Sequence, residues 1–151
     1  MDLVKSREVQ ALTGLSTDQL REWTHRRGLI PPDVKPCGSG TQALYSWRTV
    51  LLLRLAADLR KRFHLELQVH RDLLTQLRLE FNGVAFHSLW GKAVVLDGMS
   101  EIEIVDAHRP LRMASDFLFL RFDPHLEVLS RHFGTPEDAP QLPLFPAVAL
   151  R

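Results

Sequence analysis

Two short helical patterns separated by a glycine-containing turn constrain this chain more than any other feature of its sequence. The first pattern, Ser6–Thr13, is followed by Gly14, a residue that readily adopts the left-handed conformation that ends a helix. The second pattern follows Ser16, a favoured N-cap, and Gln19 stands three residues later to complete a capping box. Two short helices joined by such a turn predict a helix-turn-helix, whose second helix enters the major groove of DNA.

The second helical pattern, residues 17–27, is amphipathic. Leu20 and Trp23 fall on one face at helical spacing, whereas charged side chains occupy the other faces. Gly28 supplies a left-handed stop, and the proline pair that begins at Pro31 prevents any continuation. The sequence therefore predicts a short recognition helix with a defined beginning and end.

The segments that follow alternate between irregular and helical patterns. Residues 29–41 are rich in proline and glycine, which predicts an irregular loop or a short β-ribbon. Ser46 is another N-cap, and it precedes a strongly apolar helix over residues 47–62. We expect a further helix to start at Phe63 and to run to about Glu80.

From Val84 onward the pattern changes to short, β-rich runs separated by turns. The expected strands cover residues 84–89, 92–97, 101–105 and 117–122. A last amphipathic helix follows, with Asp123 as its N-cap and Pro124 at its first helical position. These patterns predict an α+β fold: a mainly α helix-turn-helix part, then a small α+β module of short strands and one C-terminal helix.

Four motifs in the N-terminal half follow one another in a distinctive order and spacing. They are Val9-Gln-Ala-Leu-Thr-Gly-Leu-Ser, Leu20-Arg-Glu-Trp, Arg27-Gly-Leu-Ile-Pro-Pro, and Leu44-Tyr-Ser before a leucine-rich helix. Together they resemble the MerR family of winged helix-turn-helix DNA-binding proteins, from about Val4 to about Leu74. The resemblance implies that residues 29–41 form the first wing, which lies beside the recognition helix and touches the phosphate backbone.

The chain departs from the best-known members of that family in two places. Their wing ends with an aromatic residue and an arginine, where this chain has Thr41, Gln42 and Ala43. They continue into a long helix that forms an antiparallel coiled coil in the dimer, whereas here the helical pattern ends near Phe81. The chain looks like a bacterial MerR-like subgroup, some of whose members are antitoxins or partners of neighbouring toxin proteins.

The organisation expected from these patterns has three parts: a winged helix-turn-helix domain (1–81), a small α+β dimerisation or partner module (82–134), and an extended or disordered Pro-rich tail (135–151). The net charge of +1 conceals an asymmetry. Residues 1–64 hold eleven Lys or Arg against six Asp or Glu, giving +5, and residues 65–151 hold eight against twelve, giving −4. A basic N-terminal half favours a polyanion through steering and counterion release.

The recognition helix supplies the first set of candidate DNA contacts. Near its N-terminal end, the part that approaches base edges, stand Thr17, Asp18, Gln19, Arg21 and Glu22. Arg21 occupies the basic position that follows the leucine in the resembled family. We therefore expect it to contact phosphate or guanine, the alternative being an exposed ion pair along the helix. Trp23 replaces the family's tyrosine, and it either donates its indole N–H to the DNA backbone or packs in the core.

A second set of candidates shares the ability to donate to phosphate: Arg26, Arg27, Lys35, Thr41, Gln42, Tyr45 and Lys61. Arg26 and Arg27 are phosphate contacts or part of a solvated face. Tyr45 is expected to pack under the wing with its hydroxyl at the surface. Lys61 either reaches phosphate from the family's second wing or only complements the helix dipole.

Several other classes of protein are disfavoured. A single cysteine, Cys37, allows no intramolecular disulfide and no thiolate metal site, and no two histidines fall at metal-binding spacing, so we expect neither metal nor cofactor. A Gly-rich phosphate loop, a nucleophile elbow and a carboxylate pair tied to histidine are missing from the sequence, which argues against an enzyme. The lack of a membrane-spanning or signal-type apolar run predicts a cytoplasmic, nucleoid-associated protein without a membrane contact.

Two functional hypotheses follow. The first is a sequence-specific regulator that binds an inverted repeat as a homodimer, because one recognition helix reads too few base pairs to be specific in a genome. The second is an antitoxin-like or adaptor protein whose C-terminal module and apolar tail bind a partner protein, with DNA binding as autoregulation. The apolar residues of that tail are Leu142, Leu144, Phe145 and Val148.

Overall fold

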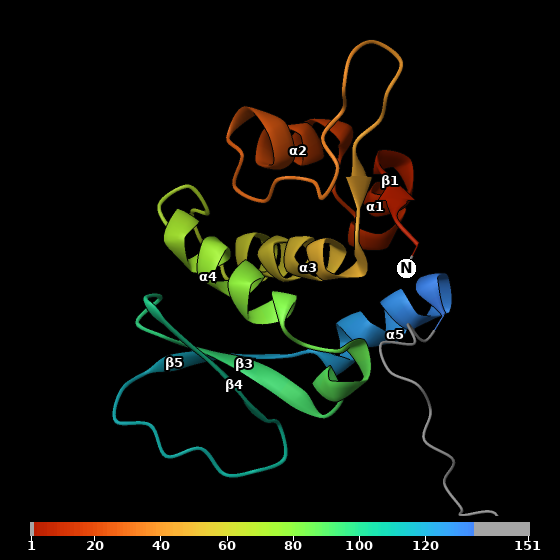
Figure 1. Cartoon of the computed structure of the whole chain (residues 1–151). Coiled ribbons are helices and arrows are strands. Elements are labelled where there is room, and N and C mark those ends of the chain that lie inside the picture. Colours follow the sequence, from red (N-terminus) through yellow and green to blue (C-terminus); the bar gives the residue numbers. More distant parts are fainter. Residues whose placement is uncertain (1, 135–151) are drawn as a thin grey trace, which may run out of the picture.

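A buried helix, α3 (Trp47–Arg62), runs through the middle of the computed structural model, which describes residues 2–134 (Figure 1). Ser46 caps it as expected, accepting a hydrogen bond from the backbone N–H of Thr49. Consecutive residues such as Leu51, Leu52 and Leu53 are all buried, so the middle of α3 is covered on every side, whereas its last turn, residues 60–62, is exposed. The expected tail, residues 135–151, lies outside the described residues.

The helix-turn-helix lies on one side of α3 and has the predicted punctuation. It consists of β1 (Val4–Lys5), α1 (Ser6–Thr13), α2 (Thr17–Arg21) and one π-helical turn, η1 (Glu22–Arg26). Gly14 between the helices is left-handed, with φ of 72°. The predicted capping box is present: Gln19 N–H donates to Ser16 Oγ at 3.1 Å, and Ser16 N–H donates to Gln19 Oε1 at 3.0 Å. Gly28, with φ of 59°, ends the recognition helix.

The predicted wing is a loop closed at its base by a small β-structure. Val34 and Leu44 exchange backbone hydrogen bonds of 3.1 and 3.0 Å. Strand β2 (Leu44–Tyr45) then pairs with β1 in antiparallel register. The loop projects beyond α2 at the end of the molecule farthest from the C-terminal sheet (Figure 1). This arrangement confirms the expected loop or short β-ribbon.

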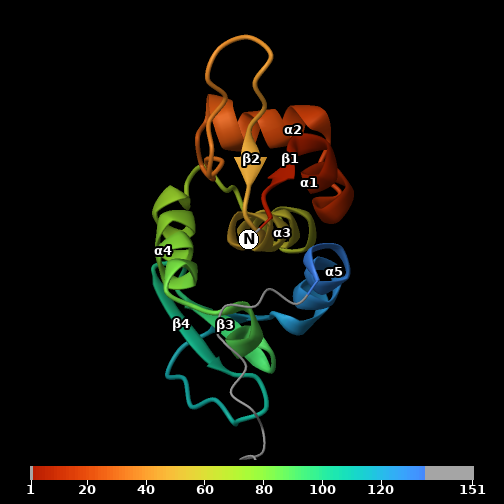
Figure 2. The same ribbon diagram turned by 45° about the vertical axis from the view of Figure 1, so that its right-hand side comes forward.

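The C-terminal half forms a three-stranded sheet with helices on one face. Its elements are α4 (Arg71–Asn82), η2 (Phe86–Leu89), β3 (Lys92–Asp97), β4 (Glu101–Asp106), β5 (Phe117–Arg121) and α5 (Asp123–Phe133). The sheet is antiparallel with the order β4-β3-β5. Val94 and Leu96 point from its central strand into the core beneath the helices. Figures 1 and 2 show α3, α4 and α5 between the helix-turn-helix and this sheet.

The prediction of a helix from Phe63 is wrong. After α3 the chain turns at His64, whose φ of 55° is left-handed, and Leu65 N–H donates back to Leu59 O at 3.0 Å. A turn follows, and α4 begins only at Arg71. The apolar spacing that suggested one longer helix comes from Leu67, which is buried from the turn rather than from a helix face.

Two further expectations in the C-terminal half are wrong. Residues 84–89 are not a strand but contain a 3₁₀ turn, because Ser88 donates to Ala85 O through both its N–H and its hydroxyl. Asp123 is not the N-cap of α5, since Phe122 O already accepts the first helical hydrogen bonds. The Asp123 carboxylate instead accepts the N–H of Gly91 at 2.8 Å and ties α5 to the start of β3.

The hydrophobic core is continuous across the expected boundary at residue 82. One cluster of buried side chains runs from Val4 in the helix-turn-helix to Leu129 in α5. The α+β class is confirmed, with helices around α3 and two small antiparallel sheets. Within residues 2–134, no helix combines the length and apolarity needed to cross a membrane.

A buried polar relay links α5 to the helix-turn-helix through α3. Arg54 Nε donates to His125 Nδ1 at 3.2 Å, and His125 Nε2 lies 3.4 Å from Asp58 Oδ2. Arg54 also donates to the backbone carbonyl of Leu12 at the end of α1. Burial and the positive charge of Arg54 together lower the pKa of His125 from 6.5 to about 4. The neutral imidazole therefore suits this site, with Nδ1 accepting and Nε2–H donating.

We predict that this site makes the protein acid-sensitive between pH 6.5 and 4. The pKa of His125 is lower in the folded than in the unfolded chain, so its contribution is complete above pH 6.5 and is lost as the pH falls through 4. The loss amounts to at most about 3 kcal/mol. Urea unfolding of the wild type and of His125→Gln over this pH range measures it. The Gln variant, which does not titrate, should have the shallower pH dependence; equal slopes would contradict the assignment.

Candidate nucleic-acid interface

A groove of about 430 Å³ lies between α1, the recognition helix and the wing. Thr17 and Arg21 line it from the recognition helix, and Thr41 and Gln42 line it from the wing. All four were predicted from the sequence as DNA contacts. The fold brings the two pairs together although more than 20 positions separate Thr17 from Thr41. Arg7 of α1 lines the same groove and was not predicted, because an exposed arginine on the first helix has no distinguishing pattern.

Arg21 presents an exposed guanidinium at this groove. Among residues 2–134 the structure shows no hydrogen bond or ion pair for its side chain, so it does not form the ion pair along the helix that was the alternative. Thr17, by contrast, donates to Gln10 Oε1 of α1 at 3.3 Å. Arg21, like the exposed Arg7 of α1, therefore offers this groove a guanidinium whose hydrogen-bonding capacity is available to a ligand.

Glu22 is held by the two arginines that follow it. Arg27 Nε lies 2.8 Å and Arg26 Nη1 lies 3.4 Å from its carboxylate oxygens. The π-helical turn helps, since Arg27 N–H donates to Glu22 O at 2.8 Å, five residues back. These exposed ion pairs are worth at most about 1 kcal/mol each, so a phosphate group can compete for either arginine.

The two aromatic candidates are buried. Trp23 is only 8% exposed and packs in the core, the second of its two expected roles. Tyr45 is fully buried beneath the recognition helix, and its hydroxyl lies 3.5 Å from Thr24 Oγ1, which donates to Leu20 O. The expected surface position of the Tyr45 hydroxyl is therefore wrong.

A second groove, of about 570 Å³, lies between the turn that joins α1 to α2 and the end of α3. Lys61 lines it together with Arg60 and His64, two residues that the sequence analysis did not select. The sequence has three basic residues in a row at positions 60–62, and their spacing alone does not show which of them line the groove. In the structure Arg62 turns away and pairs with Asp58 at 3.7 Å, whereas Arg60 and Lys61 line the groove beside Gln19.

Of the remaining candidates, Gln19 lines the second groove, and Asp18 and Lys35 are not among the residues that line either groove. Asp18 is exposed in the first turn of α2, where a carboxylate complements the helix dipole. Gln19 also lines the second groove, but its side-chain oxygen is used in the capping box. Lys35 and Cys37 are exposed on the wing loop. Within residues 2–134 no group of three His, Cys, Asp or Glu residues is arranged to hold a metal ion.

The family described as MerR HTH family regulatory protein matches residues 4–77, from β1 into α4. Residues 4–77 belong to the MerR family. MerR-type domains of this kind bind DNA in transcription regulators and are not enzymes. A search of curated proteins found no match to the chain.

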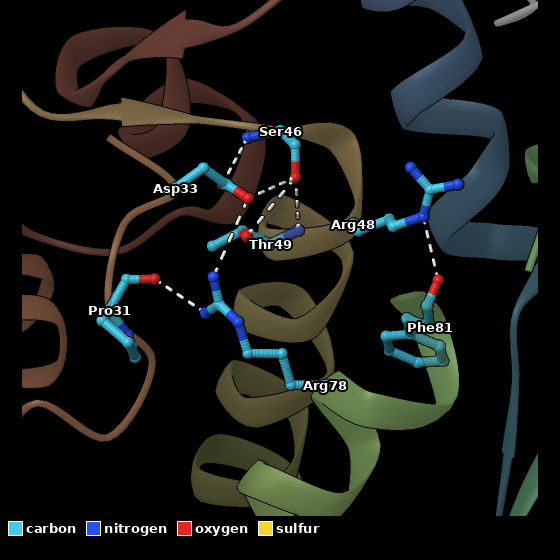
Figure 3. Close-up of polar contacts among 7 residues, drawn as sticks. All are labelled: Pro31, Asp33, Ser46, Arg48, Thr49, Arg78 and Phe81. Atoms are coloured by element: carbon cyan, nitrogen blue, oxygen red, sulfur yellow. Dashed lines mark hydrogen bonds and ion pairs between the residues drawn. The ribbon is translucent and has the colours of Figure 1, made fainter. Parts of the chain in front are cut away.

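An arginine from α4 bonds to the base of the wing in this MerR domain. Arg78 Nη1 donates to Pro31 O at 2.7 Å, and Arg78 Nη2 lies 3.8 Å from Asp33 Oδ1 (Figure 3). Asp33 in turn accepts from the backbone N–H and the hydroxyl of Ser46, at 2.7 and 3.0 Å. A second α4 arginine, Arg71, donates to Arg27 O at 2.6 Å. Helix α4 thereby fixes both the wing and the end of the recognition helix.

We predict that Arg78→Ala lowers the free energy of unfolding by about 1–2 kcal/mol, because the Pro31 carbonyl and the Asp33 carboxylate lose a charged donor. Urea unfolding at pH 7.5 measures this change. The matched control is Arg112→Ala, an exposed arginine with no side-chain contact shown within residues 2–134, which should leave stability within about 0.5 kcal/mol of the wild type. Equal stability of the two variants would contradict the role of Arg78.

Proposed function

We propose that this chain is a sequence-specific transcription regulator of MerR type, acting in the bacterial cytoplasm on nucleoid DNA, that binds an inverted-repeat operator as a homodimer. The observation that carries the proposal is the first groove. It gathers Thr17 and Arg21 of the recognition helix with Thr41 and Gln42 of the wing. Such a convergence of donors from a helix and a wing suits a DNA backbone with its adjacent base edges.

The proposed contacts divide into two groups. The N-terminal end of the recognition helix approaches the bases, with Arg21 as the donor to guanine or to phosphate. The phosphate contacts come from the flanks, and they are assigned to Arg26, Arg27, Lys35 and Lys61, with Arg7, Arg60 and His64 added from the two grooves. Trp23 and Tyr45 support this surface from below, because both are buried.

The distribution of charge supports the same orientation. The recognition helix and the wing occupy one end of the molecule and the sheet occupies the other (Figure 1). The basic residues of the helix-turn-helix and the wing, such as Arg7, Arg21 and Lys35, therefore lie at the proposed DNA end, and the acidic strand β4 lies away from it. We propose that residues 1–81 bind DNA and that residues 82–134 supply dimerisation, although the two parts share one core.

A salt-dependent DNA titration against the chain's own upstream region tests this proposal. Arg21→Ala should weaken selective binding by about tenfold to a hundredfold. Arg21→Lys separates the two roles, because lysine keeps a phosphate contact but does not make the bidentate pair with guanine. Arg112→Ala, on the opposite part of the chain, is the control and should bind as the wild type does.

Two results would contradict the proposal: binding that is equal for any duplex, or binding that is indifferent to Arg21. Either one would favour the second candidate, an antitoxin-like or adaptor protein that binds a partner through its C-terminal module and tail. The apolar sequence of that tail, with Leu142, Leu144 and Phe145, supports this alternative.

A further inference from the structure

Strand β5 has an open edge with backbone groups available for pairing. Phe122 N–H donates to Lys92 O at 3.1 Å, and residues 92 and 122 stand opposite each other when the β3–β5 register is extended by one position. Hydrogen-bonded pairs alternate along an antiparallel ladder, so Leu118 and Leu120 also bond to β3. The N–H and C=O groups of Phe117, Phe119 and Arg121 consequently point to the outer edge, where no strand pairs within residues 2–134.

The two edges of the sheet differ in how they resist self-association. Natural edge strands are usually protected by charges, prolines or bulges. Strand β4 has the acidic side chains Glu101, Glu103 and Asp106, which would face the same charges of a second β4. Strand β5 reads Phe-Leu-Phe-Leu-Arg and has a single charge at its end. Only the β5 edge is therefore suited to pair with a copy of itself.

The symmetry of such a pair suits an inverted repeat. When two identical antiparallel strands pair, their two-fold axis is perpendicular to the sheet. The helix-turn-helix is stacked above one face of the sheet, with the helices between (Figures 1 and 2). A perpendicular axis therefore keeps both recognition helices on the same side of the dimer. Packing the two sheets face to face would instead turn them to opposite sides.

We propose that two copies of the chain pair through antiparallel β5 strands, with Phe119 opposite Phe119 of the second copy, to form one six-stranded sheet. This inference rests on the proposed homodimer and names its interface. Phe117 then stands opposite Arg121 of the other copy, and about six backbone hydrogen bonds cross the interface. Arg121 already lies over an aromatic ring, 5.2 Å from the Phe119 centroid, so the charge at the strand end is compatible with this aromatic edge.

The surroundings of the edge are suited to the same occupant. A groove of about 220 Å³ lies where β5 meets the end of α3 and the start of α5, and its lining combines Phe63, Phe119 and Leu120 with the charged side chains of Asp58, Arg62 and Arg121. The Phe63 ring is 38% exposed although it is a large apolar group, and a second copy on β5 would cover it. On the other face of the sheet Phe117 and Phe119 share a stripe with the buried Val95, and pairing joins the stripes of the two copies.

Disulfide trapping tests this register directly. In a hydrogen-bonded antiparallel pair the two Cα atoms lie about 5.5 Å apart, within the range that a disulfide spans. Phe119→Cys, made in a Cys37→Ser background, should therefore oxidise to a covalent dimer. Leu79→Cys, at an apolar α4 position that is 64% exposed, is the control and should remain monomeric under the same oxidation. Equal trapping of both variants, or trapping of neither, would overturn the proposed register.

Sedimentation equilibrium of the full chain without DNA tests the interface by its loss. Phe119→Lys replaces the central apolar pair with two like charges opposite each other and should raise the dimer dissociation constant by at least about fivefold. Leu79→Lys should leave it unchanged, and circular dichroism of both variants verifies folding. A dimer that Phe119→Lys does not weaken, or a wild type that is monomeric, would overturn the interface. Selective half-site binding by a monomeric wild type would still leave the proposed DNA-binding role standing, which separates the two failures.

Discussion

The burial of the middle of α3 on all sides is the constraint on which the rest of the structure depends. A helix with three consecutive buried leucines, Leu51 to Leu53, cannot lie on the surface of a small protein, so it must be covered from every direction. Helix α1 covers it from one side, α4 and α5 from two others, and the sheet lies beyond them (Figure 2). A MerR domain whose central helix needs this cover is incomplete at residue 77, where the family match ends. The C-terminal half therefore completes the core as well as extending the chain.

The same constraint explains why arginines on the helices bond to backbone carbonyls. Where several helices pack on one central helix, the backbone carbonyls of the connecting loops need hydrogen-bond donors. An arginine can supply them, because its guanidinium forms several directed hydrogen bonds at once. Arg48 donates to Phe81 O and Val84 O, both at 2.9 Å, at the end of α4, as Figure 3 shows for Phe81. Arg54 bonds to Leu12 O and Arg78 to Pro31 O. Each contact joins segments that are more than 30 positions apart, and together they set the recognition helix and the wing relative to the core.

The features of this fold that depend on neighbouring residues could be predicted from the sequence. Those that depend on contacts between distant segments could not. The capping box at Ser16, the stops at Gly14 and Gly28 and the cap at Ser46 depend on neighbouring residues, and all are present as predicted. The position of the Tyr45 hydroxyl depended on Thr24, a residue 21 positions away in the recognition helix, and the prediction was wrong. The start of α4 was misjudged because the burial of Leu67 mimics a helical period. Arg7 and Arg60 were not selected because nothing in their own neighbourhood shows which groove they line.

The absence of a long helix after residue 82 in the described part of the chain changes how symmetry can be achieved. A coiled coil places its two-fold axis beside a long helix, whereas α4 has only 12 residues and is needed to cover α3 and hold the wing. Its four buried apolar side chains are used in the core, and only Leu79, which is 64% exposed, is left on its outer face. Dimerisation through a sheet edge requires less of the side chains, because backbone groups form most of the interface hydrogen bonds and the side chains need only avoid repulsion. An apolar edge strand β5 and an acidic edge strand β4, on opposite sides of β3, provide the difference between edges that this route to a dimer requires.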